Sequence, residues 1–340
     1  MKKSIGISIS SFAGILFLIA IAFSCKKELT TPAGSNELKR AGISTPAGTV
    51  KDIDGNVYKT VTIGTQVWMA ENLKTTRDND GRLIPYWSAP DYLVGAYSWY
   101  NNDLSNKNTY GALYNWFAVG TGKLAPKGWH VPDFAEWNLL NTYLGANAAA
   151  KLQETGSVHW LSPNPAATNE SGFAALPAGE GFSGGFSNMG TIADWWTGQA
   201  SSGIEANHFF IGVQFGNWTL SPYHDNKQMS YSVRCLKDAV PTLSTLSISG
   251  ISGSTALSGG NITINGGSAV TSRGVCWNTS HSPTIGNRHL RTNDGIGTGS
   301  FTSFVTGLRR RTTYYLRAYA TNSTGTAYGN EIIFKTTLKP

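Results

Sequence analysis

Ten of the eleven tryptophans lie between residues 68 and 218, in a stretch that is otherwise rich in glycine and asparagine. Long irregular segments supply little regular packing, so a chain of this kind must fill its interior with large side chains. We therefore expect a loop-rich globular domain with an aromatic core over residues 49–238. The chain has 340 residues, which is enough for a second core.

The N-terminus carries a separate signal. Lys2 and Lys3 precede an apolar run from Ile5 to Phe23, and the small residue Ser24 stands directly before Cys25. A basic start, an apolar centre and a small-residue end are typical of a secretory signal. Residues 1–24 resemble a bacterial lipoprotein signal peptide, which implies that Cys25 becomes the acylated first residue of the mature protein. An uncleaved membrane anchor and an ordinary secretory peptide with an incidental cysteine are the alternatives.

Residues 25–48 hold almost no large apolar side chains and repeat the tetrapeptide TPAG at 31–34 and 45–48. Such a stretch cannot bury a core, so we expect a flexible tether. A flexible chain of about 22 residues has a root-mean-square span of roughly 25 Å. The signal-like segment and the tether together predict a protein that is lipid-anchored in the bacterial cell envelope, at the outer membrane or the cell surface.

Local patterns predict the first elements of residues 49–238. Alternating residues predict strands at 56–63 and 66–69, and Asp54-Gly55 is typical of a hairpin turn before the first strand. Asp133 and Glu136 have the spacing of a capping box, with apolar residues at helical spacing up to Leu144 and Gly145 as the stop signal. This pattern predicts one amphipathic helix.

A later strand, 207–215, alternates strongly, and a further strand is expected over 230–236. Phe209, Ile211, Val213 and Phe215 share the face expected to be buried. The opposite face is expected to look outward if nothing covers it, with aromatic residues gathered around it. The ligand-binding candidates are therefore Trp195, Trp196, His208, Phe210, Gln214, Trp218 and Tyr223.

Five motifs in order resemble a known family. They are DIDGNVYKTVTIGTQVWMAENLKTT, YGALYNWFAV, PKGWHVPDFAEWNLLNTYLG, GFAALPAGEGF and SYSVRCLKD, and the family is the Fibrobacter succinogenes major paralogous domain. The resemblance implies a surface or secreted protein without an established catalytic set. It places Trp68, Trp116, Trp129 and Trp137 inside motifs, where we expect them to be core. GWHVPDFAEW and RCLKD are also similar to the C-type-lectin-like and formylglycine-generating-enzyme fold, which implies an α+β domain with long ordered loops.

Catalytic chemistry finds little support in the sequence. The formylglycine-generating reaction needs a reactive cysteine pair, and Cys235 is the one cysteine of residues 49–238. Capping explains Asp133 and Glu136, and motifs for serine hydrolases, zinc proteases and phosphate loops are absent. A carboxylate pair for glycan hydrolysis stays open among four unplaced residues, which are Glu170, Glu180, Asp194 and Glu205.

The histidines and the one calcium-like segment also give little support for a catalytic or metal site. His130 and His159 are expected to be hydrogen-bonded structural residues, whereas His208 and His224 are expected to be exposed donors near the aromatic cluster. Residues 78–81, with the sequence DNDG, have the Asp, Asn and Gly residues typical of a calcium-binding loop. They lack the glutamate that completes the ligand set of an EF-hand. We expect a solvated turn and no cofactor or metal, with calcium as the alternative.

Residues 241–340 have a different pattern, after a boundary at Pro241. Short Thr/Ser/Val/Ile-rich segments between Gly/Asn turns predict an antiparallel sandwich, with strands at 243–251, 255–265, 272–279, 300–307, 312–320 and 326–336. The end of the chain resembles a fibronectin type III-like domain, which implies a tyrosine corner at Tyr314. Tyr314, Leu316, Ala318 and Ala320 are expected to point inward, and Tyr315, Arg317 and Tyr319 outward. Cys235 and Cys276 are expected to be buried free thiols, although a bridge between them is conceivable.

The positive charge is local. Residues 239–340 carry nine Lys and Arg against two Asp and Glu, whereas residues 49–238 are net acidic. Arg309, Arg310 and Arg311 are the strongest basic feature, either as solvated charge or as a contact for an anionic envelope surface. A nucleic-acid-binding signature is absent, so nucleic acid is not an expected partner.

The sequence thus predicts a lipid-anchored binding or adhesion protein of the cell envelope that recognises a glycan or a protein without catalysis. The sandwich would serve as a spacer or a second contact. A glycan-processing accessory enzyme with an unrecognised carboxylate pair and a purely structural envelope protein are the alternatives.

Overall fold

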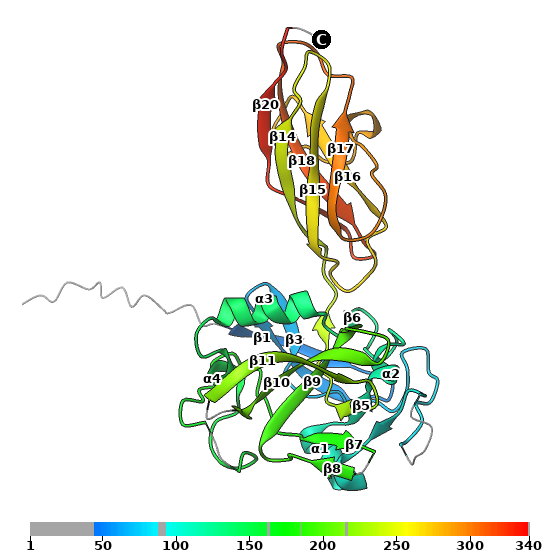
Figure 1. Ribbon diagram of the computed structural model, residues 1–340, viewed down its shortest axis with the longest axis vertical. Helices are drawn as coiled ribbons and strands as arrows, with labels where there is room; N and C mark the ends of the chain where they lie inside the picture. The colour runs from blue at the N-terminus through cyan, green and yellow to red at the C-terminus, as the bar shows by residue number, and fades with distance from the viewer. Residues whose placement is uncertain (1–43, 88–92, 162–163, 184, 215–216, 339–340) are drawn as a thin grey trace, which may run out of the picture. The chain divides into compact units, whose positions relative to one another are not determined.

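The computed structural model describes residues 44–87, 93–161, 164–183, 185–214 and 217–338 (Figure 1). The expected signal peptide 1–24, the acylated Cys25 and the tether up to residue 43 lie outside the described residues. Phe215 also lies outside them, and so do the side chains of Gln214 and Trp218. Among the helices that are described, none is both long and apolar enough to cross a bilayer.

Residues 44–237 form three sheets with a few short helices, so this part is α+β as expected. The first sheet has the order β1-β2-β3-β13-β6, the second β11-β10-β9 and the third β4-β5-β12-β7-β8. The strands are β1 Ser44–Lys51, β2 Val57–Ile63, β3 Gln66–Met69, β4 Tyr97–Ser98, β5 Leu113–Asn115, β6 Trp129–His130, β7 Glu180–Phe182, β8 Gly185–Ser187, β9 Ile192–Ala200, β10 Glu205–Gln214, β11 Asn217–Asn226, β12 Ser230–Tyr231 and β13 Leu236–Lys237.

The helices of this part are short. Helix α3, Phe134–Leu144, is the longest of those described, and its capping box is present as predicted: Asp133 Oδ1 accepts from the Glu136 amide, and the Glu136 carboxylate accepts from the Asp133 amide. The helix ends at Gly145, whose φ of +64° suits glycine. The others are α1 Lys107–Tyr110, α2 Trp116–Val119, α4 Ala148–Leu152 and the 3-10 turns η1 Tyr100–Asn102, η2 Leu104–Asn106 and η3 Arg288–Leu290.

Strand β1 corrects the expected extent of the tether. It begins at Ser44, inside the stretch 25–48, and pairs antiparallel with β2 through the predicted turn at Asp54-Gly55. Most of its side chains are exposed. Backbone hydrogen bonds hold this edge strand and need no apolar side chains, which is why the composition did not reveal it.

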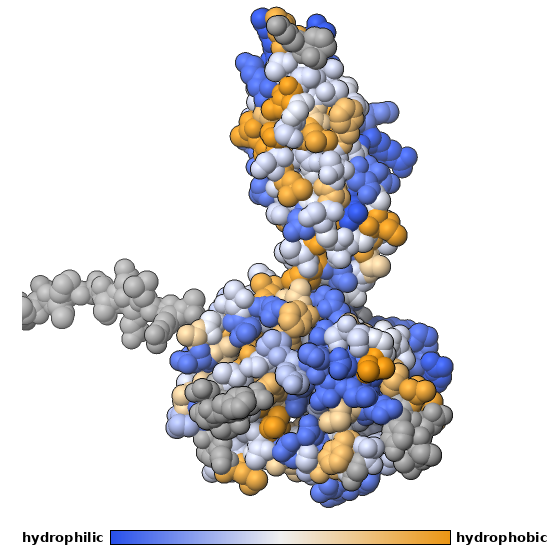
Figure 2. Space-filling view, in the orientation of Figure 1, coloured by the Kyte–Doolittle hydropathy of each residue, from blue (hydrophilic) through white to orange (hydrophobic). Residues whose placement is uncertain are grey.

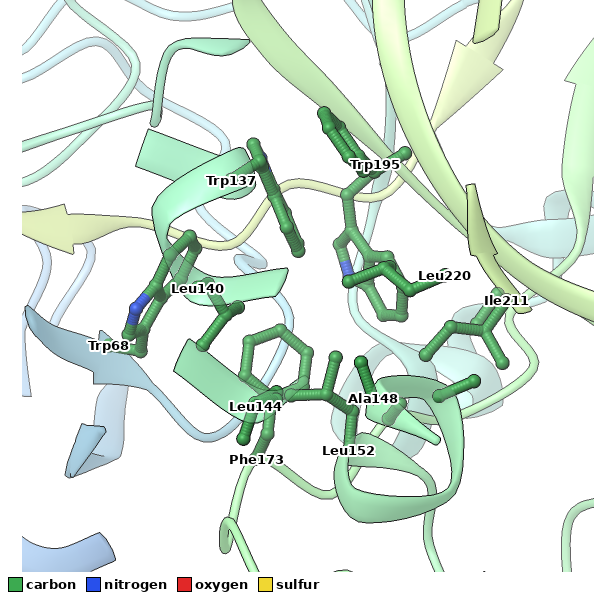
Figure 3. Packing of buried hydrophobic residues seen from close by; sticks show 14 of the residues in the cluster. Trp68, Trp137, Leu140, Leu144, Ala148, Leu152, Phe173, Trp195, Ile211 and Leu220 are labelled. Atoms are coloured by element: carbon green, nitrogen blue, oxygen red, sulfur yellow. The ribbon is translucent and has the colours of Figure 1, made fainter. Parts of the chain in front are cut away.

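Aromatic rings fill the interior of residues 44–237, as the tryptophan count predicted. Trp137 on α3 stacks on Phe209 of β10 with ring centroids 5.3 Å apart, and it lies 4.8 Å from Trp68 and 5.7 Å from Trp195 (Figure 3). Trp68, Trp137 and Trp195 are all fully buried. Helix α3 therefore joins the sheets through ring packing.

The strand expected over 230–236 is interrupted. It splits into β12 and β13, because the backbone between them turns to other partners: Ser232 bridges to Trp195 of β9, and Val233 O accepts from the Leu73 amide. The side chain of Arg234 enters the core at this interruption.

Residues 242–337 form two sheets around one core, an all-β sandwich as predicted. One sheet has the order β14-β15-β17, and in the other β16, β19 and β20 pair with β18. The strands are β14 Thr242–Ser249, β15 Ala256–Ile264, β16 Ser272–Asn278, β17 Gly299–Val305, β18 Thr313–Thr321, β19 Thr326–Tyr328 and β20 Ile332–Lys335. The segment expected as one strand over 326–336 is thus two.

The tyrosine corner is confirmed, because the Tyr314 hydroxyl accepts from the Arg309 amide at 3.0 Å. Tyr319 corrects the expected alternation: it is buried, and its hydroxyl donates to Thr292 O at 2.6 Å, so the loop at Thr292 covers this face. Cys235 and Cys276 are buried free thiols, as expected. Burial raises the pKa of both thiols, that of Cys276 to about 12.

Candidate functional site

A row of rings crosses the sheet β9-β10-β11 from core to surface. His208 of β10 pairs in register with Trp196 of β9 on one side and with Tyr223 of β11 on the other. Its ring centroid lies 5.9 Å from each of those two rings. The exposed fraction rises along the row from 0% at Trp196 through 4% at His208 to 57% at Tyr223. The sheet therefore presents one aromatic side chain to solvent on top of a buried aromatic support.

The support is held by hydrogen bonds. The Trp196 indole donates to Tyr114 O at 2.8 Å, and His208 Nδ1 lies 2.8 Å from Asp194 Oδ1. The His208 ring also stacks on Tyr231, with centroids 4.7 Å apart and planes at 22°. Because the His208 ring beside Tyr223 and the Trp196 ring one strand further are both held by hydrogen bonds, Tyr223 has a rigid neighbour.

Burial shifts the pKa of two groups that contact the row, Asp194 and Tyr231. It raises the pKa of the Asp194 carboxyl, an effect that the hydrogen bond and the charge of His208 oppose. It also raises the pKa of Tyr231, and the nearby carboxylates of Asp194 and Asp225 add to that rise. The Tyr231 hydroxyl donates to Asp225 Oδ2 at 2.9 Å, so it stays protonated at neutral pH.

Polar groups flank the exposed end of the row. Tyr223 stacks on His224 with ring centroids 5.4 Å apart and planes at 13°. His224 Nε2 lies 4.0 Å from Glu205 Oε2, and their side chains are 59% and 40% exposed. We call Tyr223, His224 and Glu205 the Tyr223 face. It combines a flat apolar ring with exposed hydrogen-bonding groups on two paired strands.

The sequence profile described as Fibrobacter succinogenes major domain matches residues 61–237, which is more than half of the chain. The chain belongs to this family. Among curated proteins, none matches it significantly. The Tyr223 face thus lies within the part of the chain that defines the Fibrobacter succinogenes major domain.

Several solved structures are similar to part of this family member. The sensor domain of the anti-sigma factor RsgI4 of Pseudobacteroides cellulosolvens has 13% identity and a TM-score of 0.22, covering 29% of this chain and 96% of that one. A fibronectin type III domain of human collagen XX has 17% identity and a TM-score of 0.21, covering 29% and 94%. A three-domain segment of titin has 14% identity and a TM-score of 0.21, covering 48% and 68%. With TM-scores this low, the sandwich assignment rests on the strand pairing itself.

The structure corrects four of the expected ligand contacts in this Fibrobacter succinogenes major domain protein. Trp195 and Trp196 are fully buried, and the Trp195 indole donates to Asn72 Oδ1 at 2.9 Å. His208 and Phe210 are buried as well, at 4% and 8% exposure. The face of β10 that was expected to look outward is covered, because the chain around Tyr231 and Ser232 packs over β9 and β10. Tyr223 is the candidate that the structure leaves exposed among those whose side chains it describes.

Sequence reasoning missed Tyr231 and Asp225, which support the row from outside the alternating strand. It had left Asp194 and Glu205 as unplaced carboxylates, and the structure places one under the row and the other on the Tyr223 face. The period of a strand shows which residues share a face, but it does not show which later segment covers that face.

His130 and His159 are hydrogen-bonded to carboxylates, as expected of structural histidines. His130 lies 2.9 Å from both Glu136 Oε2 and Asp238 Oδ1, and His159 lies 2.8 Å from Glu154 Oε2. Burial acts to lower the pKa of His130, but its two carboxylate partners raise it to about 9.

The turn at residues 78–81 uses its carboxylates for ion pairs. Asp78 lies 3.3 Å from the Arg82 guanidinium, and Asp80 lies 2.7 Å from Lys123 Nζ. The hydrogen bond with Lys123 lowers the pKa of Asp80, whose side chain is 44% exposed. A cavity of about 240 Å³ beside this turn is lined mainly by apolar residues, and its two charged side chains are Asp78 and Arg82.

Proposed function

We propose that this protein is a lipid-anchored, cell-surface binding protein that recognises a glycan through the Tyr223 face. One observation carries the proposal: Tyr223 is 57% exposed at the end of a row whose other rings are buried and hydrogen-bonded. A flat ring with two rotatable side-chain angles loses little entropy on binding and suits the apolar face of a sugar ring. His224 and Glu205 then supply partners for hydroxyl groups beside it.

The same proposal includes a fold type for each of the two domains. The helix α3, the short paired strands and the long ordered loops of residues 44–237 support a C-type-lectin-like arrangement, in which a late loop-and-strand region forms the ligand face. The tyrosine corner supports a fibronectin type III-like sandwich over 241–340. We place the anchor at Cys25, because an acylated residue there precedes a stretch without large apolar side chains.

Binding without catalysis is the form of the function that we propose. Cys235 is fully buried with a raised pKa, so its thiol is not available as a nucleophile. Asp194 is tied to His208, and Glu180 Oε1 accepts from Ser187 and Asn188. These carboxylates therefore have structural partners, which supports a binding role over glycan hydrolysis.

The test is a comparison of Tyr223→Ala with the wild-type chain on a printed glycan array, with thermal melting measured in parallel. An aromatic hot spot costs about 2 kcal/mol when truncated, so we expect roughly thirtyfold weaker binding. The melting temperature should change little, because the side chain is mainly exposed. Tyr143→Ala on α3 is the matched control, since Tyr143 is 51% exposed. Its binding should equal that of the wild type.

Trp196→Ala tests a buried ring of the row, in contrast to the exposed Tyr223. It should lower stability by about 3–5 kcal/mol, as expected for a buried tryptophan. If Tyr223→Ala binds glycans as well as the wild type does, or if the wild-type chain binds proteins and no glycan, the Tyr223 face is not a glycan site.

A further inference from the structure

The arginines of the sandwich have no carboxylate partners in the part of it that the structure describes. Its two acidic residues are already engaged: Asp294 Oδ2 accepts from Thr292 and Ser303, and Glu331 accepts from Ser282 N at 2.6 Å and lies 2.7 Å from His281 Nδ1. Three arginines use backbone carbonyls instead, namely Arg273, Arg291 and Arg317. The charge of this domain is therefore not balanced within it.

The choice of cation also differs between the two parts of the chain. Seven of the nine cationic residues of 239–340 are arginine, whereas nine of the twelve in 49–238 are lysine. The planar guanidinium binds carboxylate and sulfate oxygens in pairs, which an ammonium group does not do. Three of the seven arginines are held by backbone carbonyls, so the bidentate geometry matters for a ligand at the exposed arginines.

Three of these arginines stand together on the loop that leads into β18. Arg309, Arg310 and Arg311 are all exposed, and Lys335, which is also exposed, pairs in register with Thr313 directly after the loop. We call these four residues the basic loop. Consecutive Cα atoms lie 3.8 Å apart, well within a Debye length of about 8 Å, so the charges act together on one ligand.

The backbone of the loop is fixed. Leu308 is buried in the core, and the Arg309 amide donates to the Tyr314 hydroxyl at 3.0 Å. Thr336 Oγ1 donates to Arg309 O at 2.6 Å, and the Arg311 amide donates to Thr337 O at 3.3 Å. Little backbone entropy is lost when such a preorganised loop binds.

An exposed apolar pair precedes the basic loop in the sequence. Phe304 of β17 is 63% exposed five residues before Arg309, and it pairs in register with Leu257 of β15, which is 37% exposed. The sandwich surface in Figure 2 carries hydrophobic and hydrophilic side chains close together. An exposed ring on the strand that leads toward a row of guanidinium groups fits a polymer that has both apolar sugar faces and acidic groups.

We propose that the basic loop of the sandwich is a second binding site, for an acidic polysaccharide bearing carboxylate or sulfate groups. This site is separate from the Tyr223 face and does not depend on its function. The guanidinium groups bind the acidic groups, and Phe304 contacts the sugar rings.

The experiment measures binding of the full-length chain in detergent to immobilised polygalacturonate and dextran sulfate, with neutral dextran as the blank, over a range of salt concentrations. The variant is the triple change Arg309→Gln, Arg310→Gln and Arg311→Gln. We expect about tenfold weaker binding at low salt and a shallower salt dependence. The matched control removes three exposed lysines of the first domain, Lys59→Gln, Lys127→Gln and Lys237→Gln, with the same change in net charge. It should lose less than about twofold.

Equal losses in the two triple variants would show that net charge alone is responsible and would overturn the site. Vesicles of phosphatidylcholine with phosphatidylglycerol provide a second arm. A loss on vesicles that matches or exceeds the loss on polygalacturonate would assign the basic loop to a membrane surface and overturn the polysaccharide. Phe304→Ala should weaken polygalacturonate binding, whereas Tyr223→Ala should leave it unchanged, so the failure of one site is distinguishable from that of the other.

Discussion

Arg234 is a buried arginine that joins several segments of the first domain through hydrogen bonds. It is 1% exposed, and its guanidinium lies 4.1 Å from the centroid of the Phe173 ring. It donates to Asn72 Oδ1 at 2.9 Å, to Ala174 O at 2.9 Å and to Phe173 O. Burial lowers its pKa to about 9, an effect that the charge of Glu71 opposes. Ala174 has a φ of +51°, an unusual conformation for alanine in the segment that supplies these carbonyls.

Arg234→Met tests this role. The change leaves the carbonyls of Phe173 and Ala174 without a donor, whereas Asn72 Oδ1 keeps the Trp195 indole, and each lost partner costs about 1–3 kcal/mol. We expect a loss of about 3–5 kcal/mol in the free energy of unfolding, measured by denaturant titration. Arg77→Met is the control, because the Arg77 side chain is 50% exposed in its ion pair with Asp54. It should cost less than about 1 kcal/mol. Similar costs for the two variants would show that the buried guanidinium is dispensable.

At the scale of elements, His130 connects the start of α3 to the end of β13. Glu136 caps the helix and lies 2.9 Å from His130 Nε2, while Asp238, directly after β13, lies 2.9 Å from Nδ1. Two carboxylates on one buried imidazole hold it in the charged form at neutral pH, consistent with a pKa of about 9. An unfolded histidine has a pKa of about 6.5. The stabilisation is therefore complete below pH 6.5 and is lost as the pH rises through 9.

His130→Gln should reveal this dependence. The shift in pKa corresponds to roughly 3 kcal/mol at pH 6, and at pH 10 we expect about 1 kcal/mol for the remaining neutral hydrogen bonds. The measurement is the free energy of unfolding of variant and wild type at both pH values. His281→Gln is the control at an exposed His–Glu pair, and it should cost less than about 1 kcal/mol. A cost for His130→Gln that does not change with pH would contradict the charged bridge.

At the scale of the whole molecule, the chain combines an acidic mixed domain with a basic sandwich, and the two have separate cores. The two proposed binding surfaces lie in different domains: the Tyr223 face, proposed for sugar rings, in the acidic domain, and the basic loop, proposed for acidic groups, in the sandwich. Because β1 begins at Ser44, the proposed tether is at most the stretch from Cys25 to residue 43.

Cys25→Ser tests the proposed anchor. Without the acyl chains the protein should move from the membrane to the soluble fraction, and it should no longer incorporate labelled palmitate in cells. Cys276→Ser is the control, since this thiol is buried in the sandwich and the label should remain. Retention of Cys25→Ser in the membrane with an intact N-terminus would instead indicate an uncleaved helix.

Part of this architecture could be predicted from the amino-acid sequence. The hairpin at Asp54-Gly55, the capping box of α3 and the existence of strand β10 follow from residues close together in sequence, whereas the tyrosine corner at Tyr314 was implied by the resemblance to fibronectin type III-like domains. Aromatic composition correctly indicated a ring-filled core, because large side chains fill the space between loops.

Only the tertiary structure decided which of those rings reach the surface. Trp195, Trp196, His208 and Tyr223 all belong to the same aromatic pattern, yet three are buried and one is exposed. The difference arises because residues around Tyr231, separated from β9 by two strands, return to cover Trp196 and His208, while Trp137 and Phe173 cover Trp195 on the other face. The period of a strand tells which side chains share a face, but coverage of that face depends on long-range packing that the local pattern does not contain. For the same reason the burial of Arg234 and the partners of His130 became visible only in the folded chain.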